Sequence, residues 1–286
     1  MERRKKIIQY VIALLAATAA IVGGLFTGPS AFAVNPKDGS DVDPLTQGAE
    51  VFTGLAFDTC EAPPLGSMNA WRKSHYRAVG VYFGGRGRAC KQQPNLDRNW
   101  VRSVYDSGWS VLPIYVGSQS PCVHSENKKQ VTISGDPVSL GVEEGMDAVE
   151  RAAEHGMAEG SALYLDMEAY DQYDTECAET TLEFIRAWSD EVRSQGYLAG
   201  FYSSSTSGVQ HLATARQLGV SDLPDVVWFA RWDVSPSLYG EPVLDQEAWS
   251  PHRRIHQYKG NVTEEYGGVT MKIDRNLVDA PVAVVE

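Results

Sequence analysis

The sequence has little positive charge for its size. Its 286 residues include 25 lysines and arginines against 37 aspartates and glutamates, which gives a formal net charge of −12 at pH 7. Nucleic-acid binding is dominated by the neutralisation of phosphates with basic side chains. The composition therefore argues against a nucleic-acid partner.

The sequence also lacks the short motifs that bind nucleotides and metals. No G-x-G-x-x-G turn follows the first strand-like segment, which argues against an open, doubly wound sheet. The glycine-rich stretch at residues 84–88 has the spacing of neither that motif nor a P-loop, and we interpret it as a tight turn with solvated arginines. His252 and His256 are four residues apart, but on a strand-like segment this spacing does not build a metal site. We expect neither a metal nor a cofactor.

The first 33 residues have the pattern of an export signal. Four basic residues at positions 3–6 precede an apolar run over residues 7–26, and Ala31 and Ala33 match a small-x-small cleavage site. An uncleaved membrane anchor is the alternative, because the apolar run is long for a signal peptide. The removed segment would carry four basic and one acidic residue, so cleavage after Ala33 would leave a charge of −15. We expect a secreted protein, free or associated with the cell wall, that meets the membrane only during export.

The remaining chain has the pattern of one barrel. Residues 34–50 are polar and without periodicity, which predicts a flexible linker. Apolar runs then alternate with helical segments, as in βα units around a parallel sheet. Eight strands are expected, at residues 51–58, 78–83, 110–116, 162–168, 197–203, 226–232, 254–258 and 270–275. Helices are expected near residues 68–75, 96–107, 141–155, 177–195 and 209–218, and a long loop at 117–137. We therefore predict an α/β fold, a single (β/α)8 TIM barrel over residues 51–286, with short or missing helices after strands 6 and 7.

Acidic side chains stand where the predicted strands end. Asp58 ends the first strand, Asp166 and Glu168 end the fourth, and Asp274 ends the eighth. Catalytic residues of such barrels come from the C-terminal ends of different strands. Clustered carboxyls repel, so at least one of them should have a raised pKa and be able to donate a proton near neutral pH. This pairing of an acid with an ionised partner is what glycosidic bond cleavage needs.

Aromatic residues accompany the carboxyls. Most of the aromatics in the strands are expected to pack in the barrel or against its helices. Those nearest the strand ends could instead stack on sugar rings, and the candidates for ligand contact are Tyr82, Tyr202, Trp232 and Tyr258.

All four cysteines lie beyond the export signal. An even number in an oxidising compartment predicts two disulfides, and four cysteines allow three connectivities. Consecutive units of a wound barrel are neighbours, which favours the pairs Cys60 with Cys90 and Cys122 with Cys177.

The motifs in these strands support a family resemblance. G-x-x-F-D in the first strand, L-x-L-D-x-E in the fourth, V-W-F-A-R-W in the sixth and H-Q-Y-K-G followed by I-D-R-N at the end resemble the Chalaropsis-type muramidases, barrels that cleave peptidoglycan. The segments FDTCEAPP, VGVYFGGRGRAC and GWSVLPIYVGSQSPC are similar to an exported actinobacterial glycoside-hydrolase-like barrel family without an established substrate. The muramidase resemblance implies that Glu168 is the proton donor, that Asp166 and Asp274 assist it, and that Asp58 positions substrate or charge.

These observations lead to one leading function and two alternatives. The leading hypothesis is a monomeric, muramidase-like glycoside hydrolase that acts on peptidoglycan or another extracellular polysaccharide. The first alternative is a non-catalytic barrel that binds glycan or cell wall. The second is a phosphoesterase in which the same carboxyls hold Mg²⁺ or Ca²⁺.

Overall fold

The computed structural model describes residues 43–286. The predicted signal peptide and residues 34–42 of the predicted linker lie outside the described residues. The rest of that linker includes a short 3-10 helix, η2 (Pro44–Gln47), whose first turn is capped by the Asp43 carboxylate.

Eight strands form a closed barrel in sequential order, which confirms the predicted fold. Each strand from the first to the sixth runs parallel to the next, whereas the eighth is antiparallel to both of its neighbours, the seventh and the first. The strands are β1 (Val51–Asp58), β2 (Ala78–Gly84), β3 (Ser110–Tyr115), β4 (Ala162–Asp166), β5 (Leu198–Ser204), β6 (Val226–Ala230), β7 (Arg254–Tyr266) and β8 (Val269–Pro281).

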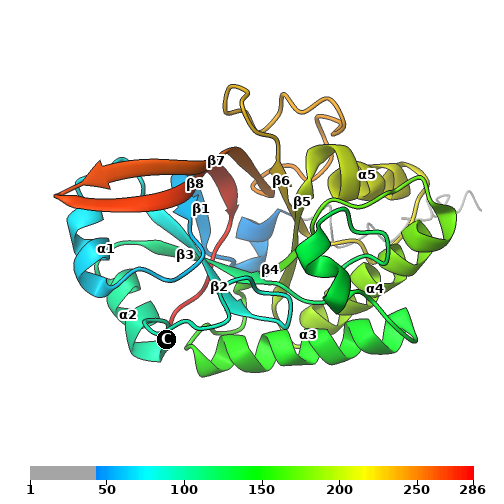
Figure 1. Ribbon diagram of the computed structural model, residues 1–286, viewed down its shortest axis with the longest axis horizontal. Helices are drawn as coiled ribbons and strands as arrows, with labels where there is room; N and C mark the ends of the chain where they lie inside the picture. The colour runs from blue at the N-terminus through cyan, green and yellow to red at the C-terminus, as the bar shows by residue number, and fades with distance from the viewer. Residues whose placement is uncertain (1–42) are drawn as a thin grey trace, which may run out of the picture. The chain divides into compact units, whose positions relative to one another are not determined.

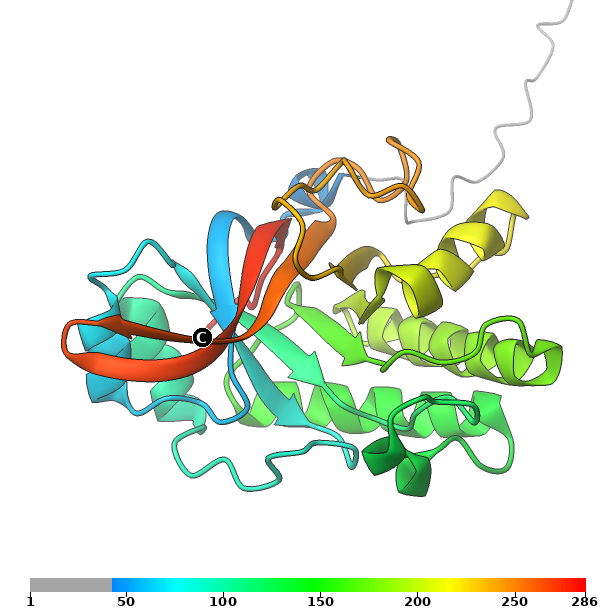
Figure 2. The ribbon, with the colours of Figure 1, turned by 45° about the horizontal axis from the view of Figure 1, so that its top comes forward.

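Helices cover the outside of the first five strands (Figures 1 and 2). They are α1 (Leu65–Trp71), α2 (Arg98–Asp106), α3 (Pro137–Glu154), α4 (Thr175–Ser194) and α5 (Gln210–Gln217), the last preceded by a π-helical turn, η4 (Ser205–Val209). The predicted loop at 117–137 contains a 3-10 helix, η3 (Glu126–Val131). Residues 231–253 form turns and irregular structure, and β7 passes directly into β8. Helices are therefore missing after strands 6 and 7, as predicted.

Alternation along the strands separates two apolar cores. In β1, Ala56 packs inside the barrel while Phe57 packs between the barrel and the outer helices. In β4, Tyr164 faces the interior, and Leu163 and Leu165 face the helices. Because successive side chains of a strand point to opposite faces, Asp58 and Asp166 lie on the interior side, at the barrel mouth.

The β7–β8 hairpin takes the place of a helix beside α1 (Figure 1). The Trp71 indole N–H donates to the Val269 carbonyl (2.9 Å), and the ring meets Tyr266 edge-on at 5.1 Å. Gly267 has a φ of 64° and lies so close to α1 that a Cβ would be 2.6 Å from the Ala70 carbonyl oxygen. The turn between the strands thus needs glycine both for its conformation and for its contact with α1.

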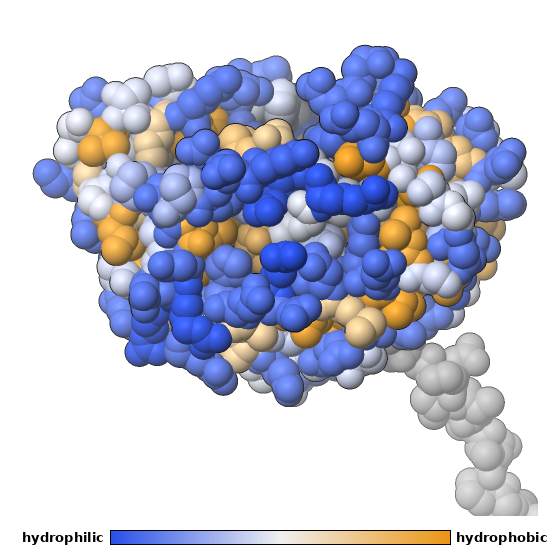
Figure 3. All heavy atoms as spheres, turned by 60° about the horizontal axis from the view of Figure 1, so that its bottom comes forward, coloured by the Kyte–Doolittle hydropathy of each residue, from blue (hydrophilic) through white to orange (hydrophobic). Residues whose placement is uncertain are grey.

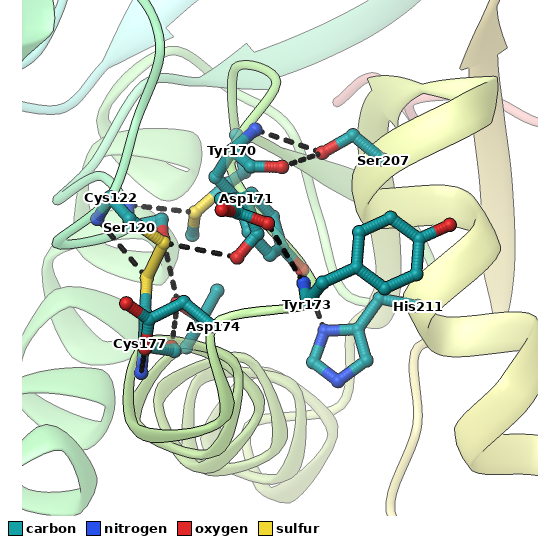
Figure 4. The surroundings of a disulfide bond; sticks show 11 residues. Ser120, Cys122, Tyr170, Asp171, Tyr173, Asp174, Cys177, Ser207 and His211 are labelled. Carbon is teal, nitrogen blue, oxygen red and sulfur yellow. Dashed lines mark hydrogen bonds between the residues drawn. A yellow bond between two sulfur atoms is a disulfide. The ribbon is translucent and has the colours of Figure 1, made fainter.

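Both predicted disulfides are present, Cys60–Cys90 and Cys122–Cys177. The second joins the segment after β3 to the start of α4 (Figure 4). Its Cys177 sulfur lies 3.0 Å from the Ser120 hydroxyl. The disulfide therefore fixes the segment that carries Gln119, whose role at the site is described below.

The face in Figure 3 is mainly hydrophilic, with small, separated apolar patches. None of the helices within residues 43–286 combines the length and the apolar composition needed to cross a membrane.

Candidate functional site

The four predicted carboxyl groups line one cavity at the barrel mouth. Its volume is about 490 Å³, and Asp58, Asp166, Glu168 and Asp274 all contribute to its wall. It is further lined by Thr59, Cys60, Tyr82, Arg88, Ala89, Cys90, Val116, Lys128, Asn261, Lys272 and Ile273. We call it the mouth cavity.

Asp58 is buried under three hydrogen bonds from neutral donors. Its Oδ1 accepts from the Tyr82 hydroxyl (2.9 Å), and its Oδ2 accepts from the Gln257 amide (3.0 Å) and the Asn276 amide (2.8 Å). Burial and then the nearby Asp274 carboxyl raise the pKa of Asp58 to about 7, against the lowering effect of these hydrogen bonds. Asp58 therefore changes its charge near neutral pH.

Asp166, the last residue of β4, is also buried. Its Oδ1 has no hydrogen-bond partner among the described residues, although the residue lines the mouth cavity. Burial, followed by the charge of Glu168, raises its pKa well above the ordinary value, and Lys128 opposes this shift. The shift favours the protonated form of Asp166 relative to an ordinary aspartate.

Glu168 is the accessible member of the group, with 40% of its side chain exposed. It lies two residues beyond the end of β4, and its Oε1 is 3.8 Å from the Lys128 Nζ. The Gln119 amide holds the intervening backbone, since it accepts from the Glu168 N–H (2.9 Å) and donates to the Asp166 carbonyl (2.8 Å). Because Gln119 is fully buried, its two hydrogen bonds fix the backbone position of Glu168.

Asp274 reaches the site from an antiparallel strand. It is the register partner of Asp58, as expected for neighbouring first and eighth strands. It does not end its strand, however, because β8 continues to Pro281, so the prediction of a strand end is wrong. Burial raises the pKa of Asp274, while the Asn261 backbone N–H and Lys272 lower it. The reversed strand direction still delivers the carboxyl to the mouth.

A second cavity borders Glu168 on its other side. It has a volume of about 410 Å³, and Tyr202 and Trp232 line it together with Glu168. The Tyr202 hydroxyl and the Trp232 indole N–H both donate to the Gln257 side-chain carbonyl, each at 2.9 Å. Gln257 in turn donates to Asp58. A hydrogen-bond chain thus joins the aromatic residues of one cavity to the buried carboxyl of the other.

The structure does not bring Tyr258 into this group. Tyr258 follows Gln257 in β7 and lines neither of the two cavities, and its ring meets His256 at 6.0 Å. Burial raises the pKa of Tyr258, and the charges that act on this pKa are those of Arg275 and Glu264. The alternation of side chains along β7 explains this placement, because Gln257 takes the inward position. Tyr82, Tyr202 and Trp232 do line the two cavities.

Several polar residues at the site were not predicted from the sequence. They are Arg88, Gln119, Lys128, Gln257 and Asn276. Asn276 follows Asp274 by two residues, so the period of the strand would have placed it on the same face. Gln119 and Lys128 lie in the segment between β3 and α3, where no periodicity indicates which side chains point inward. Within the described residues, no group of three or more His, Cys, Asp and Glu side chains could hold a metal ion.

Comparisons with known proteins give a family and a fold. The model of the Rv2525c-like, glycoside hydrolase-like domain matches residues 69–278. None of the curated proteins matches the chain. An uncharacterized protein of B. stearothermophilus shares 18% identity and superposes with a TM-score of 0.51 over 79% of this chain and 95% of that one.

Two further solved structures are similar. The Tat-secreted protein Rv2525c of Mycobacterium tuberculosis, in complex with L-tartrate, has 18% identity and a TM-score of 0.50, over 79% of this chain and 96% of that one. The spore cortex lytic enzyme SleM of Clostridium perfringens has 11% identity and a TM-score of 0.49, over 79% and 67%, which is too low to support an argument. At these identities the first two structures establish the barrel fold alone.

Proposed function

Because the chain belongs to the Rv2525c-like family of glycoside hydrolase-like domains, we propose that it is a secreted glycoside hydrolase acting on peptidoglycan or another extracellular polysaccharide. The observation that carries the proposal is the position of Glu168. Among the carboxyls of residues 43–286, Glu168 is the one that lines both the mouth cavity and the aromatic cavity next to it. A sugar chain that occupies both cavities would place a glycosidic bond beside Glu168.

The proposal assigns separate tasks to the four carboxyls. Glu168 donates the proton to the leaving glycosidic oxygen, since it is the exposed one. Asp58 and Asp274 form the acidic wall of the mouth cavity, where negative charge stabilises the oxocarbenium-like transition state. Asp166 lies next to Glu168, and its raised pKa favours the protonated form, which can donate a hydrogen bond to a sugar hydroxyl or to Glu168.

The predicted export signal and the two disulfides support an extracellular location. Disulfides persist in oxidising compartments, and both close loops at the site end of the barrel. The cell wall is the polysaccharide that such a protein meets first, and a monomer suffices because all proposed residues come from one chain.

One observation favours the alternative of a glycan-binding barrel without turnover. Asp58 already accepts three hydrogen bonds from protein side chains, which occupy three of the about four acceptor sites of a carboxylate. A site of this kind could bind sugar and leave it intact. Nothing in residues 43–286 specifically favours the phosphoesterase alternative.

Hydrolysis assays separate these functions. The purified chain and its Glu168→Gln variant would be incubated with peptidoglycan and a panel of polysaccharides, and new reducing ends would be measured. We expect Glu168→Gln to lower the rate by about 10²–10⁴, the usual contribution of a general acid. Glu183→Gln, an exposed carboxyl change on α4, is the matched control and should keep full activity.

Two results would contradict the proposal. The first is equal activity of the wild type and Glu168→Gln on every substrate. The second is the absence of turnover by the wild type on the whole panel while it still binds one of the glycans, which would establish the binding barrel.

A further inference from the structure

The glycine-rich turn after β2 forms part of the site. The sequence predicts a tight turn with solvated arginines, and the turn is confirmed: the Gly87 N–H donates to the Val116 carbonyl (2.8 Å). Gly85 has a φ of 91°, and a Cβ there would be 2.1 Å from the same carbonyl oxygen. The arginines are not simply solvated, however, because Arg88 lines the mouth cavity. The turn is therefore a rigid support for an arginine in the wall of the site.

The two arginines of this turn differ in how their charge is compensated. Arg86 lies 3.3 Å from a Glu144 oxygen and donates to the Ser118 hydroxyl at 2.6 Å. Arg88 donates only to backbone carbonyls, from Nε to Gly85 (3.1 Å) and from Nη1 to Tyr82 (3.2 Å). Among residues 43–286 it has no carboxylate partner within ion-pair distance. Burial, and then the charge of Arg151, lower its pKa, whereas Tyr115 and the Asp147 carboxylate raise it.

Lys128 adds a second cation to the same wall. It lies on η3 with only 8% of its surface exposed, and its Nζ donates to the Gly87 carbonyl (2.8 Å), one residue from Arg88. Its separation of 3.8 Å from Glu168 is longer than a hydrogen bond. An ammonium group has three donors, so Lys128 can still donate to a ligand in the mouth cavity.

We propose that Arg88 and Lys128 form a subsite for a carboxylate carried by the sugar in the mouth cavity. The two cations stand on the β2–β3 side of the cavity, and the carboxyls of β1, β4 and β8 stand on the others. A guanidinium anchored on two backbone carbonyls suits a planar carboxylate, which it can bind through charge-assisted hydrogen bonds. The substrate class is therefore an acidic glycan, and this inference rests on the proposed function of the cavity as a glycan site.

Local charge outweighs the charge of the whole chain at this place. The formal net charge of −12 repels anions at long range, but salt screens this repulsion beyond about 8 Å at physiological ionic strength. Within the cavity Arg88, Lys128 and Lys272 face four carboxyls. Burial raises the pKa values of Asp166 and Asp58, the latter to about 7, which lessens the negative charge that faces the cation wall.

Calorimetric titration with matched sugars tests the subsite without requiring turnover. N-acetylmuramic acid differs from N-acetylglucosamine by a 3-O-lactyl group that carries a carboxylate, and glucuronic acid differs from glucose by a carboxylate at C6 in place of the hydroxymethyl group, so the two pairs separate two sources of the charge. We expect the acidic member of at least one pair to bind about tenfold more tightly, the usual effect of one charge-assisted hydrogen bond. Arg88→Gln should abolish this preference and Arg88→Lys should retain part of it. Arg102→Gln, an exposed change on α2 with the same effect on net charge, should leave it intact.

A salt titration of the wild type provides a test that no folding defect can obscure. Raising sodium chloride from about 0.05 to about 0.5 M should weaken binding of the acidic sugar and leave that of the neutral sugar unchanged. Equal affinity for both members of each pair, no binding of any of the four sugars at millimolar concentration, or an unchanged preference in Arg88→Gln would each overturn the inference. These outcomes are independent of the hydrolysis assay: the preference can fail while Glu168-dependent turnover stands, and turnover can fail while the preference stands.

Discussion

Burial of Asp58 should make the barrel less stable as the pH rises, and removal of its charge should abolish that effect. The pKa of Asp58 is raised from 3.8 to about 7. Between these two values the folded chain keeps a proton that the unfolded chain has lost, so the free energy of unfolding falls as the pH rises through this window. One pKa unit corresponds to about 1.4 kcal/mol, which gives about 4 kcal/mol for the whole shift.

The Asp58→Asn variant tests this reasoning. Urea unfolding of the wild type and the variant would be measured from pH 4 to pH 8. Because asparagine does not titrate, the stability of the variant relative to the wild type should increase by up to about 4 kcal/mol over this range, whatever the constant effect of the substitution is. The Asp166 and Asp274 carboxyls interact with Asp58, so the difference also includes the change that the substitution makes in their titration.

The control is Asp106→Asn, which removes an exposed carboxyl on α2 from its pair with Arg102. Its stability relative to the wild type should change by less than about 1 kcal/mol across the same range, as for other surface pairs. The reasoning is refuted if Asp58→Asn follows the wild type in parallel from pH 4 to pH 8. A relative loss of stability at high pH would show that Asp58 is stabilised as a carboxylate.

Three further changes probe how the site is held. Gln119→Met leaves the Glu168 N–H and the Asp166 carbonyl unpaired. In a hydrolysis assay it should lower kcat about tenfold or more with little change in KM. In a urea titration it should lower the free energy of unfolding by about 2 kcal/mol. Equal losses in Gln119→Met and Gln119→Glu would argue against a specific amide clamp. Replacing Cys122 and Cys177 by alanine should cost up to about 4 kcal/mol, the loop-closure value for a separation of 55 residues. Differential scanning calorimetry would measure this change, and an unchanged Tm would contradict it. Trp71→Ala should cost about 3–5 kcal/mol in chemical unfolding, since a fully buried ring and its bond to Val269 are lost. A cost below about 1 kcal/mol would show that the hairpin does not depend on this contact.

The sequence predicted the features that depend on local period and chain order. The first strand was placed at residues 51–58, as observed, because its apolar alternation ends at a charged residue. Asp58 and Asp166 were correctly placed at the mouth for the same reason. The disulfides followed from chain order alone, since sequential winding makes consecutive units neighbours.

The direction of β8 was missed, although the sequence has a signal for it. Gly267 and Gly268 stand between two alternating segments, a pattern typical of a tight hairpin. The regular βα repeat of the preceding chain predicts a parallel eighth strand instead. A hairpin also explains why β7 and β8 are much longer than the predicted strands at residues 254–258 and 270–275.

The polar residues around the carboxyls could not be found in this way. Gln119 and Lys128 lie in a segment without periodicity, and their orientation depends on contacts with residues that are distant in the chain. Gln119 bonds with residues 166 and 168, and Lys128 bonds with Gly87. Such pairs are a property of the folded barrel, because loops at its mouth meet only after the strands have closed.

The antiparallel β8 links the site to the outer layer of the barrel. Its inward residues are Asp274, which lines the mouth cavity, and Asn276, which donates a hydrogen bond to Asp58. The residue between them, Arg275, points outward and pairs with Glu264, which also accepts a hydrogen bond from the Tyr76 hydroxyl beside α1. One strand therefore contributes Asp274 and Asn276 to the site on one face and Arg275 to an ion pair on the other. Displacement of the hairpin would disturb both together, so stability and site geometry depend on the same segment.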